Sequence, residues 1–249
     1  MRSSIVAAVI LAALPALANP RALPFTYPYE TLAQGALEIE QFADLTQVQS
    51  IDAADNKRSW TADFQLITEI EYGVTDTLEL GLYFQFVSEP GEAPLIFDGI
   101  KQRLRYRLAE QGQWPVDVSV YAELAEMHDE VELELKLNLQ RRIGRAKVMV
   151  NFWGEREFHY DGTGAWVLNP TAGVTFEVTA WLHVGVEYWM RAKLDDYTHH
   201  FVGPAISVQF KKLWWSVAPY LRLDGLGTPT PYNDPFGRFW VRSVIGLNL

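Results

Sequence analysis

The chain alternates between apolar and polar positions with a period of two over most of its length. In residues 78–86 the even positions are apolar, while the odd positions include Glu79 and Gln85. In residues 131–139 the odd positions are Val or Leu, and the even positions include Glu132 and Glu134. Alternation of this kind is typical of a β-strand that has one apolar and one polar face.

Segments of this type follow one another from residue 36 to residue 249, and each is close to the ~9–11 residues that a tilted strand needs to cross a bilayer. They are 36–48, 59–72, 77–88, 98–108, 114–125, 130–141, 146–155, 165–178, 181–191, 200–211, 212–223 and 238–249. So many amphipathic strands cannot all turn their apolar faces into one small interior. We therefore predict the inverse, with apolar faces toward lipid and charged faces toward a hydrated lumen. The predicted fold is all-β, a transmembrane antiparallel up-and-down β-barrel of about twelve strands.

The connections between these segments differ in length in an alternating way. The odd-numbered ones are predicted to be long and polar, namely residues 50–59, 88–97, 155–164, 192–200 and 223–237, with a short exception near Met127. The even-numbered ones are predicted to be brief, namely residues 73–76, 109–113, 142–145, 179–180 and 211–212. Long loops outside and tight turns on the periplasmic side are typical of outer-membrane barrels.

The first 18 residues have the features of a secretory signal peptide, with a basic start, an apolar core and small residues before a cleavage site preceding Asn19. Residues 19–35 are rich in Pro and Tyr and are predicted to be a periplasmic N-terminal segment. This segment has three possible positions: hanging in the periplasm, docked on the lower rim, or inside the lumen as a partial plug. Residues 36–249 form the predicted outer-membrane barrel.

Composition narrows the function classes. The chain has 21 Lys and Arg against 31 Asp and Glu, a formal net charge of −10, which argues against a nucleic-acid partner. It has no cysteine, so disulfides and a lipid-anchored N-terminus are excluded. Stability is therefore expected to come from a closed strand ladder and from burial.

Aromatic residues on the apolar faces are predicted to form two belts at the membrane–water interfaces. The outer belt is Trp60, Phe84, Phe86, Phe152, Trp166, Tyr188 and Phe239, and the inner belt is Tyr72, Tyr106, Trp114, Phe176, Phe210 and Trp215. A soluble sandwich with an aromatic core is the alternative, but it does not explain why the opposite faces carry Arg and Glu so consistently.

The last strand ends at Leu249 and is expected to pair with the first strand, because unpaired backbone groups are very costly in lipid. Outer-membrane barrels often end in Phe, and their assembly machinery, a predicted partner of this chain, is thought to recognise that end. Leu249 is a mild departure from that pattern.

Three stretches carry a resemblance to a known family: PFTYPYETLAQGALEIEQF, EIEYGVTDTLELGLYFQF and FDGIKQRLRYRLAE. With them the chain resembles a group of proteobacterial outer-membrane barrels, similar to the porin-like proteins labelled as the MetA pathway of phenol degradation. The shared features are a Tyr-Gly-Val-Thr-Asp turn and the strand alternation. The resemblance implies an outer-membrane fold, and it carries over neither a substrate nor a catalytic motif.

A ladder of cations is predicted to line the lumen, with carboxylates on the neighbouring strands. The cations are Lys101, Arg103, Arg105 and Arg107, and the carboxylates are Glu69, Glu71, Glu79, Asp117, Glu123, Glu132 and Glu134. Two interpretations stay open. The charges are a selectivity wall that favours particular ions or solutes, or they satisfy one another in a structural network.

The rest of the lumen is predicted to be lined by small residues, namely Thr171, Gly173, Gly203, Ala205, Ser207, Ser216, Ala218 and Gly246. Small inward residues leave an open path, mark tight backbone bends, or make space for a folded-in loop. The sequence does not separate these three interpretations.

Two groups of residues carry side chains that take part in metal binding or catalysis in other proteins. Two predicted outer loops hold His159, Tyr160 and Asp161, and Asp195, Asp196, Tyr197, His199 and His200, but no ligand spacing is diagnostic of a metal. His183 and Ser207 are the nearest pair for nucleophilic catalysis, yet both are predicted to face the lumen and no oxyanion-hole signature surrounds Ser207. We therefore predict no metal, no cofactor and no enzymatic activity.

The predicted function is passive diffusion of small polar or charged solutes through a porin-like channel in the outer membrane of a Gram-negative cell, with outer-membrane lipids as partners. The first alternative is a non-conducting barrel with ligand-binding loops or a structural role in the envelope. A lipid-modifying enzyme and a soluble export product are less favoured alternatives.

Overall fold

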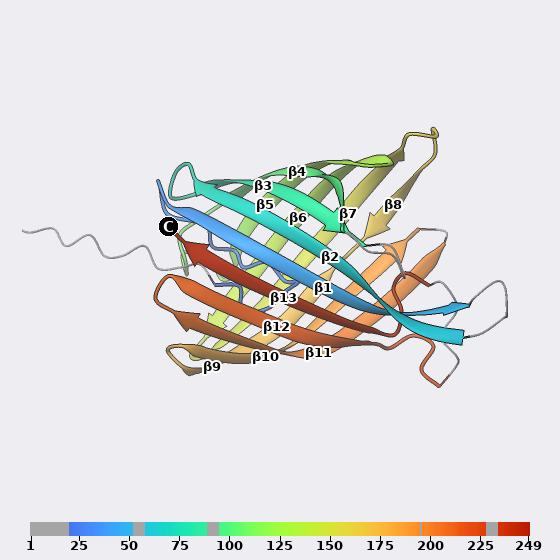
Figure 1. Cartoon of the computed structure of the whole chain (residues 1–249). Coiled ribbons are helices and arrows are strands. Elements are labelled where there is room, and N and C mark those ends of the chain that lie inside the picture. Colours follow the sequence, from blue (N-terminus) through green and yellow to red (C-terminus); the bar gives the residue numbers. More distant parts are fainter. Residues whose placement is uncertain (1–19, 52–57, 89–94, 195, 228–233) are drawn as a thin grey trace, which may run out of the picture.

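The structure, a computed structural model, describes residues 20–51, 58–88, 95–194, 196–227 and 234–249. These residues form one antiparallel sheet that closes into a barrel (Figure 1). Its strands are β1 (Leu37–Ile51), β2 (Arg58–Gly73), β3 (Leu78–Val87), β4 (Ile96–Arg107), β5 (Asp117–Met127), β6 (Glu130–Ile143), β7 (Ala146–His159), β8 (Gly164–Leu168), β9 (Thr171–Thr179), β10 (Leu182–Lys193), β11 (Tyr197–Phe210), β12 (Leu213–Arg222) and β13 (Phe239–Asn248). The barrel closes where β13 pairs with β1, from Glu38 opposite Asn248 to Gln47 opposite Phe239.

The barrel has twelve strand positions, because β8 and β9 share one of them. Both pair with β7 on one side and with β10 on the other. The interruption falls at Asn169 and Pro170, since proline has no N–H to donate to the ladder. The predicted strand 165–178 is therefore a broken strand, and the prediction of twelve antiparallel strands is confirmed.

The apolar faces of the strands point outward and the charged faces inward. On β6, Leu133 is 46% exposed and Leu135 is 59% exposed, whereas Glu134 between them is 3% exposed. Arg103 on β4 is also 3% exposed. A soluble β-barrel would show the reverse pattern. No described residue belongs to a helix long and apolar enough to span a bilayer.

The strands extend further at one end of the barrel than the sequence predicts. The predicted loop at 155–164 is largely strand, because β7 continues to His159, and the predicted loop at 192–200 is taken up by the end of β10 and the start of β11. A hairpin ladder can continue past the apolar band wherever water solvates both of its faces. We call this the long-loop end. The opposite, short-turn end carries tight turns and one longer connection, 108–116, where only five residues were predicted.

Aromatic side chains lie exposed near both ends of the barrel wall. Trp60 and Trp166 are more than half exposed on the side of the long-loop end, whereas Phe152, predicted for the same belt, lies opposite Leu137 in the middle of β7. Tyr72 and Phe210 are comparably exposed on the side of the short-turn end. The pattern agrees with two interfacial belts.

The N-terminal segment lies inside the barrel at the short-turn end, where it is the blue trace within the wall in Figure 1. Its side chains Leu23, Phe25, Tyr27 and Tyr29 are 0–8% exposed. Of the three positions left open by the sequence, the structure shows the one within the lumen for the described residues of this segment. We call residues 20–34 the lumen segment. The signal peptide and Asn19 lie outside the described residues.

Candidate functional site

The lumen segment is held in place by side chains of the barrel wall that bind its backbone. The carboxylate of Glu187 on β10 accepts hydrogen bonds from the N–H groups of Phe25, at 3.0 Å, and Thr26. The amide of Asn151 on β7 accepts from Tyr27 N at 2.7 Å and donates to Tyr27 O at 3.0 Å. Main-chain groups without a strand partner are thereby satisfied away from water.

Apolar packing adds to this polar anchoring. The ring of Phe25 stacks on Trp189 with 4.5 Å between centroids and meets Tyr220 edge-on at 5.2 Å. A Cβ at Gly173 would lie 2.3 Å from Leu23 Cδ1 and 2.8 Å from the backbone oxygen of Val186, so a glycine here makes room for Leu23. Small inward residues here make space for a folded-in segment, one of the three interpretations that the sequence left open.

Arg21 is the buried cation of the lumen segment. Its Nε lies 3.3 Å from Glu40 Oε2, and its Nη2 lies 3.6 Å from Glu69 Oε2. The guanidinium is stacked over the ring of Tyr27 at 3.6 Å and lies 4.9 Å from the ring of Phe42. Burial opposes its charged form, but Glu40 and Glu69 outweigh this and hold the pKa of Arg21 above its ordinary value.

Glu30 anchors the segment near the short-turn end. Its Oε1 lies 3.0 Å from Lys147 Nζ and accepts a hydrogen bond of 2.8 Å from Gln140 Nε2. Burial alone would raise the pKa of Glu30, but the charge of Lys147 and the bond from Gln140 outweigh burial and lower it. The ionised form of Glu30 is therefore the one that holds the segment.

The predicted charge ladder divides into three environments. Arg103 lies at the centre of a buried group, bonded to Glu69, Glu71 and Glu79, and Arg105 joins it through Glu79 at 2.7 Å. We call these five residues the arginine–glutamate cluster. Their mutual pairing and burial favour the structural-network interpretation for this part of the ladder.

The remaining predicted lumen residues lie elsewhere. Lys101 is further toward the long-loop end, 3.6 Å from Glu123 and 3.2 Å from Glu132. Arg107 is at the short-turn rim, where it pairs with Glu110 at 2.9 Å. Asp117 accepts a hydrogen bond of 2.6 Å from Gly112 N in the connection before β5.

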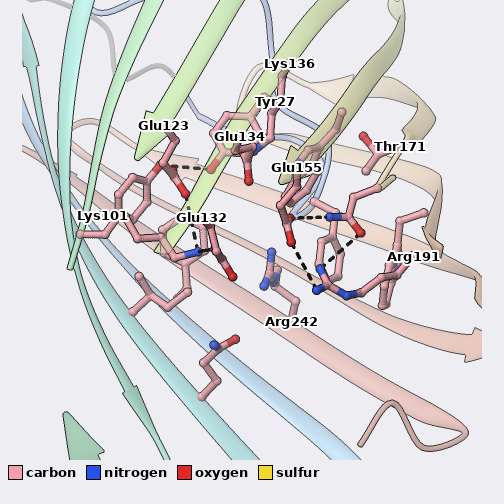
Figure 2. A pocket seen from close by; sticks show the side chains of 18 of the residues that line it. Tyr27, Lys101, Glu123, Glu132, Glu134, Lys136, Glu155, Thr171, Arg191 and Arg242 are labelled. Atoms are coloured by element: carbon pink, nitrogen blue, oxygen red, sulfur yellow. Dashed lines mark hydrogen bonds and ion pairs between the residues drawn. The ribbon is translucent and has the colours of Figure 1, made fainter. Parts of the chain in front are cut away.

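A cavity of about 310 Å³ occupies the half of the lumen toward the long-loop end, and we call it the vestibule (Figure 2). The lumen segment contributes Phe25 and Tyr27 to its lining. The charged lining residues are Lys101, Glu123, Glu132, Glu134, Lys136, Glu155, Arg191 and Arg242. Cations and carboxylates therefore line one space together, along with aromatic rings.

Several of these charged residues were missed from the sequence. Lys136 Nζ lies 2.6 Å from Glu134 and 3.7–4.2 Å from the ring centroids of Tyr27, Tyr121 and Trp153. Arg191 pairs with Glu155 at 3.3 Å, and Arg242 forms an ion pair with Asp44. Each occupies an inward position of its strand, so the same alternation that located the ladder could have found them. Glu187, the anchor of the lumen segment, was missed for the same reason.

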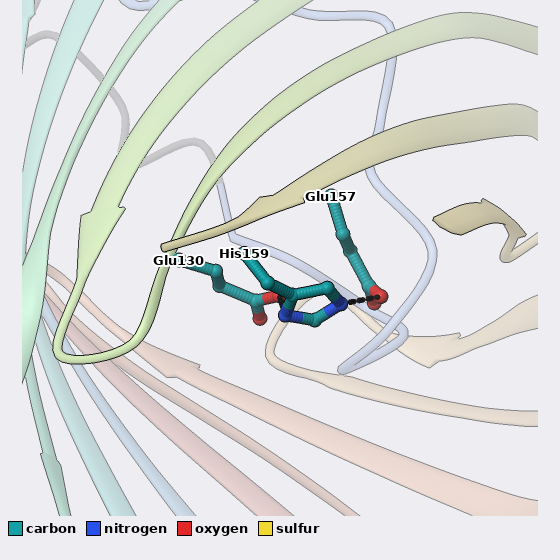
Figure 3. A group of neighbouring side chains, drawn as sticks. All are labelled: Glu130, Glu157 and His159. Carbon is teal, nitrogen blue, oxygen red and sulfur yellow. Dashed lines mark ion pairs between the residues drawn. The ribbon is translucent and has the colours of Figure 1, made fainter. Parts of the chain in front are cut away.

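The histidines of the long-loop end have separate partners. His159 Nδ1 lies 2.9 Å from Glu130 and its Nε2 lies 3.5 Å from Glu157, a grouping whose ligand atoms are close enough for a metal ion (Figure 3). Glu157 is also paired with Lys193 at 2.8 Å, a cation that competes with a metal for this carboxylate. His199 pairs with Asp224 at 2.9 Å, and Asp195 lies outside the described residues.

His183 and Ser207 are directly opposite each other on β10 and β11 and both face the lumen. Ser207 is 2% exposed. Within the described part of the chain no hydrogen bond joins the two side chains, so the geometry of a nucleophile activated by a base is not assembled here.

Comparisons with known proteins locate the fold but not a family. No family model and no curated protein matches the chain. Among solved structures it is similar to the COG4313 outer membrane channel from Pseudomonas putida F1, with 12% identity, a TM-score of 0.63, and coverage of 89% of this chain and 98% of that one. It is similar to the NanC porin, with 11% identity, a TM-score of 0.58, and coverage of 84% and 100%. The translocator domain of the autotransporter NalP from Neisseria meningitidis matches with 9% identity, a TM-score of 0.51, and coverage of 87% and 89%. At these identities the likeness shows a shared barrel fold.

Proposed function

We propose that this chain is an outer-membrane channel of a Gram-negative cell for small charged solutes, and that the lumen segment closes it in the conformation seen here. The apolar outer wall would contact outer-membrane lipid, with the long-loop end outside and the short-turn end in the periplasm. Two of the similar structures are a channel and a porin, which supports this class of function.

The observation that carries the proposal is that the obstruction is a peptide segment outside the strand ladder. Residues 20–34 belong to no strand, and hydrogen bonds, ion pairs and ring contacts hold them to the wall. Such contacts can break and reform, whereas strands of the wall cannot leave it without opening the barrel.

The vestibule supports the same proposal from the other end of the lumen. It is lined by both signs of charge and by aromatic rings, and it ends at Phe25 and Tyr27 of the lumen segment. A small charged solute entering from the long-loop end would find partners there and would stop at the segment. Movement of the segment would then complete the passage.

Single-channel recording in planar bilayers tests the proposal. A variant lacking residues 20–33 is expected to conduct steadily, while the full chain stays mostly closed. A second variant keeps the length but replaces 20–33 with Gly and Ser, and it should also conduct, because the seated contacts and not the length close the lumen. Thr31→Ala, which removes a rim contact to Asp76 O, is the control and should stay closed.

The alternative is a non-conducting barrel whose vestibule binds a ligand, and it is favoured by the filled short-turn half of the lumen. Heat modifiability on SDS gels would show whether both segment variants are folded. If both are folded and neither carries current, this result would contradict the channel and support the alternative. We propose no enzymatic activity, and a release of fatty acid that depends on His183 and Ser207 would argue against that.

A further inference from the structure

We propose that the wall residues Glu40, Glu69 and Phe42, which we call the Arg21 site, bind guanidinium and ammonium groups, so that organic cations are the solutes this passage favours. The inference rests on the channel proposed above and names its solute class. Arg21 of the lumen segment is then a tethered occupant of the site.

The site has the parts that a planar organic cation requires. Glu40 Oε2 lies 3.3 Å from Arg21 Nε, and Glu69 Oε2 lies 3.6 Å from Arg21 Nη2. The ring of Phe42 lies 4.9 Å from the guanidinium carbon. Two carboxylates and an aromatic ring attract a guanidinium by charge and by cation–π interaction. All three of these groups belong to the barrel wall, on β1 and β2.

Arg21 fills the site loosely. Among the described residues, Glu40 Oε2, Glu69 Oε2 and Arg21 Nη2 are buried and have no hydrogen-bond partner. Their ion-pair distances exceed the ~2.7–2.9 Å of a charge-assisted hydrogen bond, whereas Arg103 in the neighbouring cluster lies 2.6 Å from Glu79. The buried carboxylate oxygens are therefore available to a free cation whose position is not restricted by a peptide chain.

The wall next to the Arg21 site is acidic as well. Glu187 and Glu79 bind N–H groups of the lumen segment, and both would face the passage once the segment had left. The same movement exposes cations too. Lys136 and Arg242, which lie against Tyr27 and Phe25, keep their wall partners Glu134 and Asp44. Lys147, nearer the rim, loses its partner Glu30. A narrow passage lined mainly by carboxylates concentrates cations.

The vestibule does not impose this preference by itself. Its carboxylates are already paired, Glu132 with Lys101, Glu134 with Lys136 and Glu155 with Arg191. Opposite charges balance there, so solutes of either sign can enter. Selection by charge is expected to occur at the Arg21 site, below Phe25 and Tyr27.

Ion selectivity is the first test, measured as the reversal potential of the variant lacking residues 20–33 in a potassium chloride gradient. We expect potassium to be preferred over chloride by about threefold or more. Adding Glu40→Gln, which leaves the arginine–glutamate cluster intact, should bring that ratio toward one. Glu110→Gln, a rim carboxylate paired with Arg107, is the matched control and should leave the ratio unchanged.

Chemical rescue is the second test, and it does not depend on conduction. Arg21→Gly in the full chain vacates the site, and millimolar ethylguanidinium is expected to raise the midpoint of its thermal unfolding. Wild type, where Arg21 occupies the site, and the double variant Arg21→Gly/Glu40→Gln should show no such rise. Urea has a similar planar shape without charge and should not rescue.

The outcomes separate this inference from the proposed channel. Current with chloride preferred or with no preference, or rescue by urea equal to rescue by ethylguanidinium, would overturn the Arg21 site while the channel stands. Absence of current in every folded variant contradicts the channel, and the rescue measurement then decides the site alone.

Discussion

Arg103 lies in the lumen with its side chain fully buried and paired with Glu69, Glu71 and Glu79. Burying charged groups costs desolvation free energy, and in this cluster the attraction between the guanidinium and the carboxylates offsets that cost. Removing one member leaves its partners buried with less of this attraction. Gly81 leaves space for the Arg103 side chain, because a Cβ at Gly81 would lie 2.6 Å from Arg103 Cγ. At the residue scale, charge pairing and the space left by small residues determine which side chains pack in the lumen.

Arg103→Gln should therefore lower the free energy of unfolding by about 3–5 kcal/mol, because it removes the cation of buried Glu71 and leaves Glu69 and Glu79 with only Arg21 and Arg105. Urea titration of the barrel in detergent measures this. Arg107→Gln is the control from the same strand, and its exposed pair with Glu110 should change stability by about 1 kcal/mol or less. Equal losses for the two variants would contradict the assignment of a buried cluster.

Gly246→Ala tests the demand for space. Its new Cβ would meet the ring of Trp214 at 2.2 Å, and that ring is fully buried and donates to Glu38. Overpacking is expected to cost about 1–3 kcal/mol. Gly154→Ala is the matched control, since the nearest side-chain atom there, Leu168 Cδ2, is 3.7 Å away. Thermal unfolding that fails to separate the two variants would count against a tight contact at Trp214.

At the scale of the element, the lumen segment differs from every strand. A strand of the wall satisfies its backbone on two neighbours, whereas residues 20–34 depend on side chains such as Asn151 and Glu187. The strands β8 and β9, by contrast, rejoin the regular ladder directly after the break between them, because Met190 N on β10 donates to Pro170 O at 3.0 Å. A segment outside the regular ladder is stable where the wall supplies hydrogen-bond partners for its backbone.

The anchor of the segment at Glu30 predicts a dependence on pH. The pKa of Glu30 is lower in the folded chain than its ordinary value of about 4.3, so its stabilising contribution is complete above that value. The contribution is lost as the pH falls through the lowered pKa. Channel opening in acid on the short-turn side should therefore increase below about pH 4.3.

Glu30→Gln should remove that part of the acid response while leaving the barrel folded. Single-channel open probability between pH 7 and acid is the measurement, and Glu110→Gln at the same rim is the control. An unchanged acid response in Glu30→Gln would show that other groups release the segment.

At the scale of the whole molecule, the apolar outer surface determines whether the barrel is more stable in lipid or in water. Leucines at 133, 135 and 137 lie on one outward face of β6, and the wall carries exposed aromatic rings toward both ends. Such a surface is unfavourable in water and favourable in lipid. The hydrated interior and the apolar exterior are therefore two consequences of one strand pattern.

Leu135→Arg should destabilise the barrel by about 2–4 kcal/mol when it is folded in lipid, because it places a charge near the centre of the apolar band. Ile143→Arg, at the end of the same strand, should cost about 0–1 kcal/mol because it lies near the interface. Denaturant titration in lipid vesicles measures both. A larger loss at Ile143 than at Leu135 would be inconsistent with the membrane placement proposed here.

The architecture could be predicted from the sequence to a large degree, for a physical reason. The alternation of side chains along a strand is local, so it assigned an outward direction to Leu135 and an inward one to Glu134 without knowledge of the neighbours. The number of strands followed from counting the alternating segments, and the closure of β13 on β1 followed from the cost of open edges in lipid.

The occupant of the lumen was decided only by the tertiary structure. Arg21, Phe25 and Glu30 lie in a segment without period, and two of their partners, Trp189 and Lys147, are far away in the sequence. Alternation shows that Gly173 points inward, but it cannot show that Leu23 fills the space beside it. Contacts between a non-repeating segment and a closed wall depend on how their side chains fit together in three dimensions. The alternation of apolar and polar positions does not encode that fit.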